Sequence, residues 1–218
     1  MEHLLGTLAT GLRILASDGG LTAEAASIEL LYGATSLFVV DLEMSGSNAQ
    51  LHEVIDLGGI RCALDPELTE AEAWGSRVRP KHIGNANPGA LKVVGYSPKA
   101  WKSAIELDAA FDRFAEVGKG AIIAGWGIGQ DMAFLTESMR RLSRPWPFAG
   151  IALDIQPIAR KLLGGGQVDR FNLGHVADRL GIGRMGEHGA LADAYATYDV
   201  LVKLVERARA EALDSSLA

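Results

Sequence analysis

Cysteine is almost absent from this chain, whose 218 residues include only Cys62. A single thiol excludes an internal disulfide and any metal site built from several cysteines. The run around it, "VIDLGGIRCAL", is mostly apolar, and a lone cysteine in such surroundings behaves as a small hydrophobic side chain. Cys62 is therefore predicted to be a buried residue of a β-strand.

Long apolar runs are also missing. No stretch approaches the roughly 18 unbroken apolar residues that cross a membrane as a helix. The N-terminus does not combine a basic region with an apolar core and a cleavage site, so no signal peptide is expected. We expect a cytoplasmic protein with no membrane contact.

Positive charge is in short supply as well. Lys and Arg number 21 against 27 Asp and Glu, which gives a formal net charge of −6. This balance excludes a protein that binds polyanions through its overall surface charge. It does not exclude an enzyme that binds the phosphates of its substrate through metal ions. The hydrophobic share of 48% suits one compact α/β domain with a well-buried core.

Strand-like runs come first along the chain, and helices alternate with strands afterwards. Strands are expected at 36–44, 51–64 and 73–80, and their short connections favour an antiparallel meander. This order predicts an α/β fold in which helices cover a five-stranded mixed sheet. The later elements are expected at 121–126 and 149–154 for strands, and at 97–118, 130–142, 156–163, 171–181 and 189–210 for helices.

The first residues are expected to be helical. Leucines recur at helical spacing over residues 3–16, and a shorter helix is predicted over 22–32. We therefore divide the chain into a helical N-terminal leader (1–35), one domain (36–210) and a flexible tail (211–218).

The segment "GAIIAGWGIGQDMAFL" has the strand, glycine-rich turn and helix of a dinucleotide-binding loop. A Rossmann fingerprint reads Gly-x-Gly-x-x-Gly, and its third glycine allows close helix–strand packing. Here Gln130 occupies the position of that third glycine, and three predicted strands precede a strand that should come first. A Rossmann-type nucleotide-binding protein is kept as an alternative, with Asp154 in the place of the ribose-binding acid.

Two further segments place acidic residues where chemistry could occur. "VVDLEMSG" puts Asp41 and Glu43 two residues apart on a strand, so both carboxylates point to the same face. Carboxylates held together in apolar surroundings repel unless a cation lies between them. Near the C-terminus, "GEHGALADAYATYDVL" carries His188 before the last helix and Asp193 beside its buried face. Taken singly, each signal is also typical of solvated side chains.

In this order, the motifs resemble those of the DEDDh 3′–5′ exonucleases, which include oligoribonuclease, RNase T and the proofreading subunit of the bacterial replicative polymerase. The resemblance rests on Asp-x-Glu in "DLEMSG", on Asp131 in "GIGQDMAFL", and on His-x-x-x-x-Asp, which begins in "HGALADA". "HEVIDLGGI" is similar to the family's second strand, and "ALDIQPIARKL" is similar to the strand and helix that come before the last motif. The match covers about residues 36–206 and implies a ribonuclease-H-like fold.

The resemblance implies a hydrolase that releases nucleoside 5′-monophosphates from the 3′ ends of single-stranded DNA or RNA. Two Mg²⁺ or Mn²⁺ ions are expected, because such ions prefer hard oxygen ligands. His188 is expected to be the general base, since the unperturbed pKa of histidine is about 6.5. The expected metal ligands, which are also catalytic residues, are Asp41, Glu43, Asp131 and Asp193.

Substrate contacts are expected from Met44, Ser45 and Trp126. Met44 follows the acid pair at a family position that abuts the terminal nucleotide. Trp126 and Gly127 stand where many relatives have an Asn, often after a His, so the hold on the substrate backbone is expected to differ here. The segment "GSRVRPKH" is either a small basic patch for nucleic acid or a solvated turn.

The alternative from another class of function is a non-catalytic ribonuclease-H-like interaction module. An intact set of four mutually repelling acids argues against it. The choice between DNA and RNA, the substrate length and a homodimer are left open.

Overall fold

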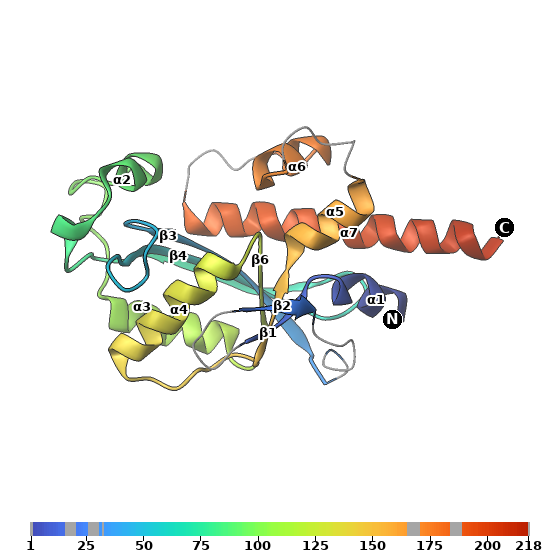
Figure 1. Cartoon of the computed structure of the whole chain (residues 1–218), viewed down its shortest axis with the longest axis horizontal. Helices are drawn as coiled ribbons and strands as arrows, with labels where there is room; N and C mark the ends of the chain where they lie inside the picture. The colour runs from blue at the N-terminus through green and yellow to red at the C-terminus, as the bar shows by residue number, and fades with distance from the viewer. Residues whose placement is uncertain are drawn as a thin grey trace.

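The computed structural model describes residues 2–15, 21–25, 31, 33–164, 171–183 and 189–217. Within them a seven-stranded mixed sheet crosses the molecule, and helices cover its faces (Figure 1). Its strands, in the spatial order β2-β1-β7-β6-β3-β4-β5, are β1 (Leu12–Leu15), β2 (Leu21–Ala25), β3 (Ser36–Met44), β4 (Val54–Ala63), β5 (Glu70–Arg77), β6 (Ile122–Gly125) and β7 (Ile151–Asp154). The helices are α1 (Glu2–Ala9), α2 (Pro88–Val94), α3 (Leu107–Gly118), α4 (Gly129–Leu142), α5 (Ile155–Leu163), α6 (Leu173–Arg179) and α7 (Ala190–Leu217), with a short 3₁₀ helix η2 (Ile83–Asn85).

The meander predicted from the sequence is present. β3 pairs with β4 and β4 pairs with β5, in both cases antiparallel, whereas β6 runs parallel to β3 and β7 runs parallel to β6. β-Branched and aromatic side chains in "SLFVVDLEM" suit β3, which is buried along most of its length. The predicted mixed sheet flanked by helices is therefore confirmed, with the acid pair on its central strand.

The N-terminal leader differs from its prediction, because it contributes two strands as well as a helix. α1 ends at Ala9, after which β1 pairs antiparallel with β7 and β2 pairs with β1. The leucine spacing fits a helix, but the edge of β7 offers hydrogen bonds that only an extended segment can use. A Cβ at Gly11 would stand 2.1 Å from the carbonyl oxygen of Asp154, so glycine lets the chain reach that edge.

The five predicted strands thus become seven. β2 takes the first part of the helix predicted over 22–32, and residues 26–30 and 32 lie outside the described residues. The sequence did not predict the two added strands, because β1 forms by pairing with the distant β7, and β2 in turn pairs with β1. Local periodicity does not encode such a long-range contact.

The helix predicted over 97–118 is shorter than expected, since α3 begins at Leu107 and turns precede it. A separate helix, α2, was not predicted. It begins after Asn87, whose side-chain oxygen accepts hydrogen bonds from the N–H groups of Gly89 (2.8 Å) and Ala90 (3.2 Å). Proline at its first position and an asparagine cap are typical helix-start signals.

Three smaller predictions can be compared with the structure. Cys62 lies in β4 and is fully buried, as predicted. α7 continues to Leu217, so the tail predicted as flexible is helical as far as that residue. No helix within the described residues has the length and apolar character needed to span a membrane.

Alternate residues of β3 pack into opposite apolar layers. Leu37 and Val39 belong to a cluster with α5 and α7, whereas Phe38 belongs to a cluster with α3 and α4 on the other face (Figure 1). Side chains alternate along a strand, so Asp41 and Glu43 continue the row that faces α7. On this face of β3, the apolar residues Leu37 and Val39 are therefore followed by the acids Asp41 and Glu43.

Candidate active site

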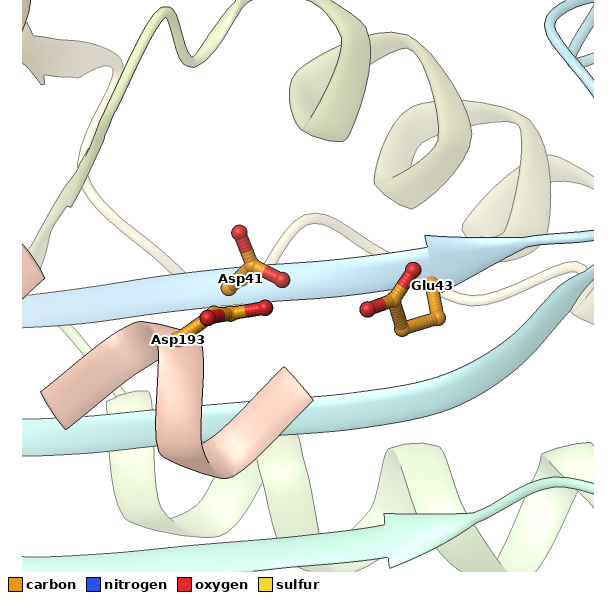
Figure 2. A group of neighbouring side chains, drawn as sticks. All are labelled: Asp41, Glu43 and Asp193. Carbon is orange, nitrogen blue, oxygen red and sulfur yellow. The ribbon is translucent and has the colours of Figure 1, made fainter. Parts of the chain in front are cut away.

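Three carboxylates from two elements meet at the end of this row. Asp41 and Glu43 come from β3, and Asp193 comes from the first turn of α7. One oxygen of each carboxylate lies within 4.8 Å of the other two, and Figure 2 shows the three side chains turned toward one another. Carboxylate oxygens at this spacing are a ligand set for a hard divalent cation.

Glycines in the sheet let α7 pack close enough to place Asp193 beside Asp41 and Glu43. Gly58 of β4 pairs with Asp41 on one side and with Gly75 of β5 on the other. A Cβ at Gly58 would lie 2.2 Å from the backbone nitrogen of Leu191, and one at Gly75 would lie 2.8 Å from the Cβ of Leu191. The beginning of α7 therefore rests directly on the backbone of the sheet, beside Asp41.

Asp131 approaches the same cluster from the other direction. It lies in the first turn of α4 and is 9% exposed. Its carboxylate accepts a hydrogen bond from the backbone N–H of Leu42, which lies between the two acids of β3. The negative charge of Asp131 also raises the pKa of Asp41, so the two carboxylates are electrostatic neighbours.

Asp154 fixes the turn that leads to Asp131. Its carboxylate accepts hydrogen bonds from the N–H of Gly127 (3.0 Å) and from the N–H of Gln156 (3.1 Å), where it caps α5. Gly127 has φ of 62°, a left-handed conformation that glycine adopts at low cost. The glycines of this segment thus shape a tight strand-to-helix turn, and Asp154 caps a helix instead of binding a ribose.

The electrostatics of the cluster show an excess of negative charge. Burial, followed by the charges of Asp131, Glu43 and Asp193, raises the pKa of Asp41 well above its usual value. Burial and neighbouring acids also raise the pKa of Glu43 to about 7. Burial is the main cause that raises the pKa of Asp131 to about 7. Carboxylates in this situation favour either protons or a bound cation.

A further acid beside the cluster, Asp56, was missed by the sequence analysis. It lies on β4 directly opposite Glu43 and is 8% exposed. Residues directly opposite each other in an antiparallel pair point to the same face, so Asp56 also faces α7. Burial raises its pKa, while Arg77, its partner on β5, acts in the opposite direction.

Asp56 anchors the beginning of α7 to the sheet. Its carboxylate accepts a hydrogen bond from the backbone N–H of Ala190, the first residue of that helix. A carboxylate at a helix N-terminus is stabilised by the unpaired N–H groups and the helix dipole. The only sequence signal was an acid within the apolar strand "VIDLGG", and its meaning depended on a cross-strand register that is not visible locally.

The predicted substrate residues Met44 and Ser45 occupy the end of β3 next to the acids. Met44 is partly buried and packs against the layer of α3 and α4. Ser45 is buried, and its hydroxyl accepts a hydrogen bond from the N–H of Glu53 (2.9 Å). Ser45 thus has a structural role in the loop that follows β3, and its contact with substrate stays a prediction.

Trp126 and His188 differ in what the structure shows of them. The Trp126 ring stacks on Phe171, with 6.4 Å between ring centroids, and packs against the layer of α5 and α7. This packing accounts for an aromatic residue at the end of β6, and contact with substrate stays a prediction. His188 lies outside the described residues, although the next residue, Gly189, accepts a hydrogen bond from the N–H of Asp193 (3.1 Å).

We expect the metal-free protein to lose stability as pH rises from about 4 to about 7. The raised pKa values of Glu43 and Asp131 mean that the folded state holds more protons than the unfolded chain within this window. Their stabilising protonation is complete below the unfolded pKa values and is lost as pH passes through about 7. The pKa of Glu137 is lowered from 4.5 to about 2, so its opposite contribution changes at the acidic end of this window and below it.

Thermal unfolding of EDTA-treated protein between pH 4 and 8 measures this effect. We expect Mn²⁺ to flatten the profile, because a cation that binds ionised carboxylates stabilises the folded state most where protons are absent. A melting temperature that rises through this range in EDTA would contradict the crowded-carboxylate description.

Comparison with known proteins gives the fold and the family. A family model described as "Exonuclease" matches residues 38–201. The chain is 25% identical over 170 residues to the epsilon subunit of DNA polymerase III from Aquifex aeolicus, and the match covers 77% of this chain and 79% of that subunit. It is also 25% identical over 185 residues to a Mycobacterium tuberculosis protein named as a bifunctional exonuclease/endonuclease, covering 82% of this chain but 28% of that protein.

Among solved structures, E. coli Exonuclease I in complex with a dT13 oligonucleotide matches with a TM-score of 0.66 at 20% identity. The match covers 83% of this chain and 43% of Exonuclease I. The chain therefore spans less than half of that enzyme and about a quarter of the mycobacterial protein. These findings confirm the predicted ribonuclease-H-like fold and show that the Rossmann alternative is wrong.

Proposed function

The chain belongs to the RNase T exonuclease family, and we propose that it is a metal-dependent 3′–5′ exonuclease acting on single-stranded nucleic acid. The observation that carries the proposal is the meeting of Asp41, Glu43 and Asp193 inside the segment that the family model matches. Asp131, which the sequence places in the same motif order, adds its charge to the cluster. The product would be a nucleoside 5′-monophosphate.

The residues present fit a pair of divalent cations. Every donor in the cluster is a carboxylate, and the pKa values of Asp41, Glu43 and Asp131 are raised because burial and neighbouring acids outweigh the contacts that stabilise their charge. Mg²⁺ and Mn²⁺ prefer such oxygen ligands. When bound, they would supply Lewis-acid neutralisation of the phosphate and activation of the attacking water. Asp41, Glu43, Asp131 and Asp193 are the residues proposed to hold them.

The chain's own groups would have distinct tasks in the reaction. The carboxylates on β3, α4 and α7 would hold the cations in place, because each lies on, or at the start of, a regular element. His188, placed by the sequence directly before Gly189, would accept the proton of the attacking water. Met44 and Ser45, which follow the acids on the same strand, are proposed to meet the terminal nucleotide.

Two features favour the enzyme over a non-catalytic interaction module. The acids are costly to keep in a buried position without a cation, since each raises the pKa of another. In addition, the chain is similar along most of the epsilon subunit's length. The names of the relatives point to DNA, whereas "DLEMSG" is most like oligoribonuclease, which points to RNA. We therefore propose as substrate the feature common to both polymers, a single-stranded 3′ end. A cytoplasmic location stays a prediction, and the oligomeric state stays open.

One panel of substrates tests the proposal. Single-stranded DNA and RNA labelled at the 5′ end, from dinucleotides to strands of about twenty residues, are digested with Mg²⁺, with Mn²⁺ and with EDTA. We expect ladders that shorten from the 3′ end and that require a divalent cation. Internal cuts, cleavage in EDTA, or no cleavage of any member would each refute the assignment.

His188→Ala should lower turnover by roughly 10²- to 10⁴-fold, because a positioned general base contributes that much to a hydrolysis. The decline of the wild-type rate at low pH should disappear in the variant, since the titrating group has been removed. Mn²⁺ affinity, measured by calorimetry, should stay close to that of the wild type. Equal rates, or a parallel loss of metal binding, would assign His188 another role.

A further inference from the structure

Basic residues are concentrated in one part of this acidic chain. Residues 73–105 contain six of the 21 Lys and Arg residues and none of the 27 Asp and Glu residues. The rest of the chain therefore carries a formal charge of −12, against +6 for this segment. Such a separation gives the molecule one local surface that attracts polyanions although its net charge is negative.

Most of this segment, residues 78–105, forms a small lobe with η2, α2 and the turns before α3, whereas Arg77 belongs to β5. Trp101 is 6% exposed and donates a hydrogen bond from its indole nitrogen to the carbonyl oxygen of Ile55 in β4 (2.9 Å). Val94 and Tyr96 pack around it in a separate apolar cluster. We call this unit the basic lobe, and its internal core gives it a defined position on the sheet.

The basic lobe is attached directly beside the acids. The N–H of Asn87, the cap of α2, donates to the carbonyl oxygen of Ser45 (2.7 Å), two residues after Glu43. The carboxylate of Glu53 accepts hydrogen bonds from the N–H groups of Lys81 (3.1 Å) and His82 (2.8 Å). In Figure 1, α2 lies beyond the ends of β3 and β4, at the end of the molecule where α7 begins.

The basic residues of the lobe fall into two groups. Arg79 and Lys81 face Glu106, at 2.9 Å and 3.9 Å, so part of their charge is neutralised. Lys92, Lys99 and Lys102 are exposed and form no ion pair with any described residue. Beside Lys92, Val93 is 73% exposed and offers an apolar surface.

We propose that the basic lobe binds the phosphates of a single strand on the 5′ side of the nucleotide held at the acids. The proposal rests on the proposed exonuclease function, because it takes the 3′ end to lie at Asp41 and Glu43. A strand leaving that point would pass α2 within a few nucleotides, where Lys92, Lys99 and Lys102 meet its phosphates. Surfaces that bind single strands without sequence preference combine such charges with apolar or aromatic contacts to bases.

The test compares two variants with equal loss of charge. The first is Lys92→Gln/Lys99→Gln/Lys102→Gln. The matched control is Lys119→Gln/Lys161→Gln/Lys203→Gln, which removes three exposed lysines outside the lobe. Binding of fluorescein-labelled oligo(dT) and oligo(U) strands of about twelve nucleotides is measured by anisotropy in Ca²⁺ buffer at several salt concentrations. Hydrolysis of thymidine 5′-monophosphate p-nitrophenyl ester in Mn²⁺ is measured in parallel.

We expect the lobe variant to bind the strands roughly tenfold more weakly than the wild type. The slope of log K against log salt should become shallower by about 2, since each phosphate contact to a single strand contributes about 0.7. The control should keep the wild-type slope, and both variants should hydrolyse the ester at the wild-type rate, because it is too short to reach the lobe.

Three results would overturn the proposal: equal weakening in both variants, which would indicate overall charge; no weakening in either; or no binding of the strands by the wild type. Failure of the ester and of the strands to be cleaved, with lobe-dependent binding intact, would remove the exonuclease assignment and leave the nucleic-acid surface. The binding measurement therefore tests the basic lobe, and the hydrolysis measurement tests the exonuclease assignment independently. A different effect on oligo(dT) and oligo(U) would identify the preferred polymer.

Discussion

Replacing Asp41 with asparagine should slow hydrolysis by orders of magnitude and, at the same time, raise the melting temperature of the metal-free protein. Asp41 lies among four other acids, and burial together with their charges raises the pKa of its carboxyl well above the usual value. Asparagine is nearly isosteric and uncharged, so the variant keeps the shape of the site while it removes the repulsion. The effects on activity and stability should therefore have opposite signs.

The loss of activity should reach roughly 10²- to 10³-fold or more, since metal ions contribute several kcal/mol to phosphoryl transfer and each 1.4 kcal/mol is about tenfold. The gain in stability should be about 2–4 °C for each kcal/mol of repulsion relieved in a domain of this size. Nuclease rate and thermal unfolding in EDTA at pH 8 are measured on the same preparation.

Asp199→Asn is the matched control for this substitution. Asp199 lies on α7 outside the acid cluster, and burial and Glu70 raise its pKa, so the control removes a similarly disfavoured carboxylate. It should leave the rate unchanged. An Asp41→Asn variant that retains wild-type turnover, or that melts at a lower temperature in EDTA, would contradict the role given to the cluster.

Gly58→Ala should reduce turnover by roughly a hundredfold, although residue 58 carries no reactive group. The added Cβ would lie 2.2 to 2.4 Å from backbone atoms of Ala190 and Leu191, so the beginning of α7 must move away from the sheet. Asp193 would move with it, and a displacement of about 1 Å at a catalytic group can cost a factor of about 10². Overpacking should also cost about 1–3 kcal/mol of folding free energy.

Gly59→Ala is the control, because a Cβ at residue 59 would face the apolar layer of α3 and α4 and not α7. A Cβ there would lie 2.3 Å from the ring of Phe38, far from α7 in the fold, and should destabilise the protein without moving Asp193. Rates per folded molecule and Mn²⁺ affinity separate the two effects. Equal rates for Gly58→Ala and Gly59→Ala would show that close seating of α7 is not needed for activity.

The parts of this site that sequence could predict are those carried by local patterns. Alternation along a strand predicted that Asp41 and Glu43 share a face, and the structure shows it. The placement of Asp193 beside them was predicted from the order of the motifs. Local sequence patterns do not predict which strand the last helix packs against. The metal-binding and catalytic roles of these residues, and of His188, stay predictions.

The parts that sequence missed depend on contacts between distant segments. Asp56 has a role at the site because it lies opposite Glu43 and accepts a hydrogen bond from Ala190. Gly58 has a role because its lack of a side chain lets α7 pack directly against the sheet. The leader was assigned the wrong structure for the same reason: its leucines fit a helix, but pairing with β7 decides the outcome. Propensity is a weak guide wherever a free sheet edge is available.

The N-terminal strand pair has a consequence for any attempt to trim the protein to its matched core. Leu8, Leu12 and Leu31 are almost completely buried, in the same apolar layer that lies beneath α5 and α7. A shortened chain that began at residue 36 would uncover this layer and leave the backbone groups of β7 unpaired along its outer edge. Uncovered strand edges pair readily with other chains. We therefore expect a chain trimmed to begin at residue 36 to self-associate more readily than the chain that keeps its first 35 residues.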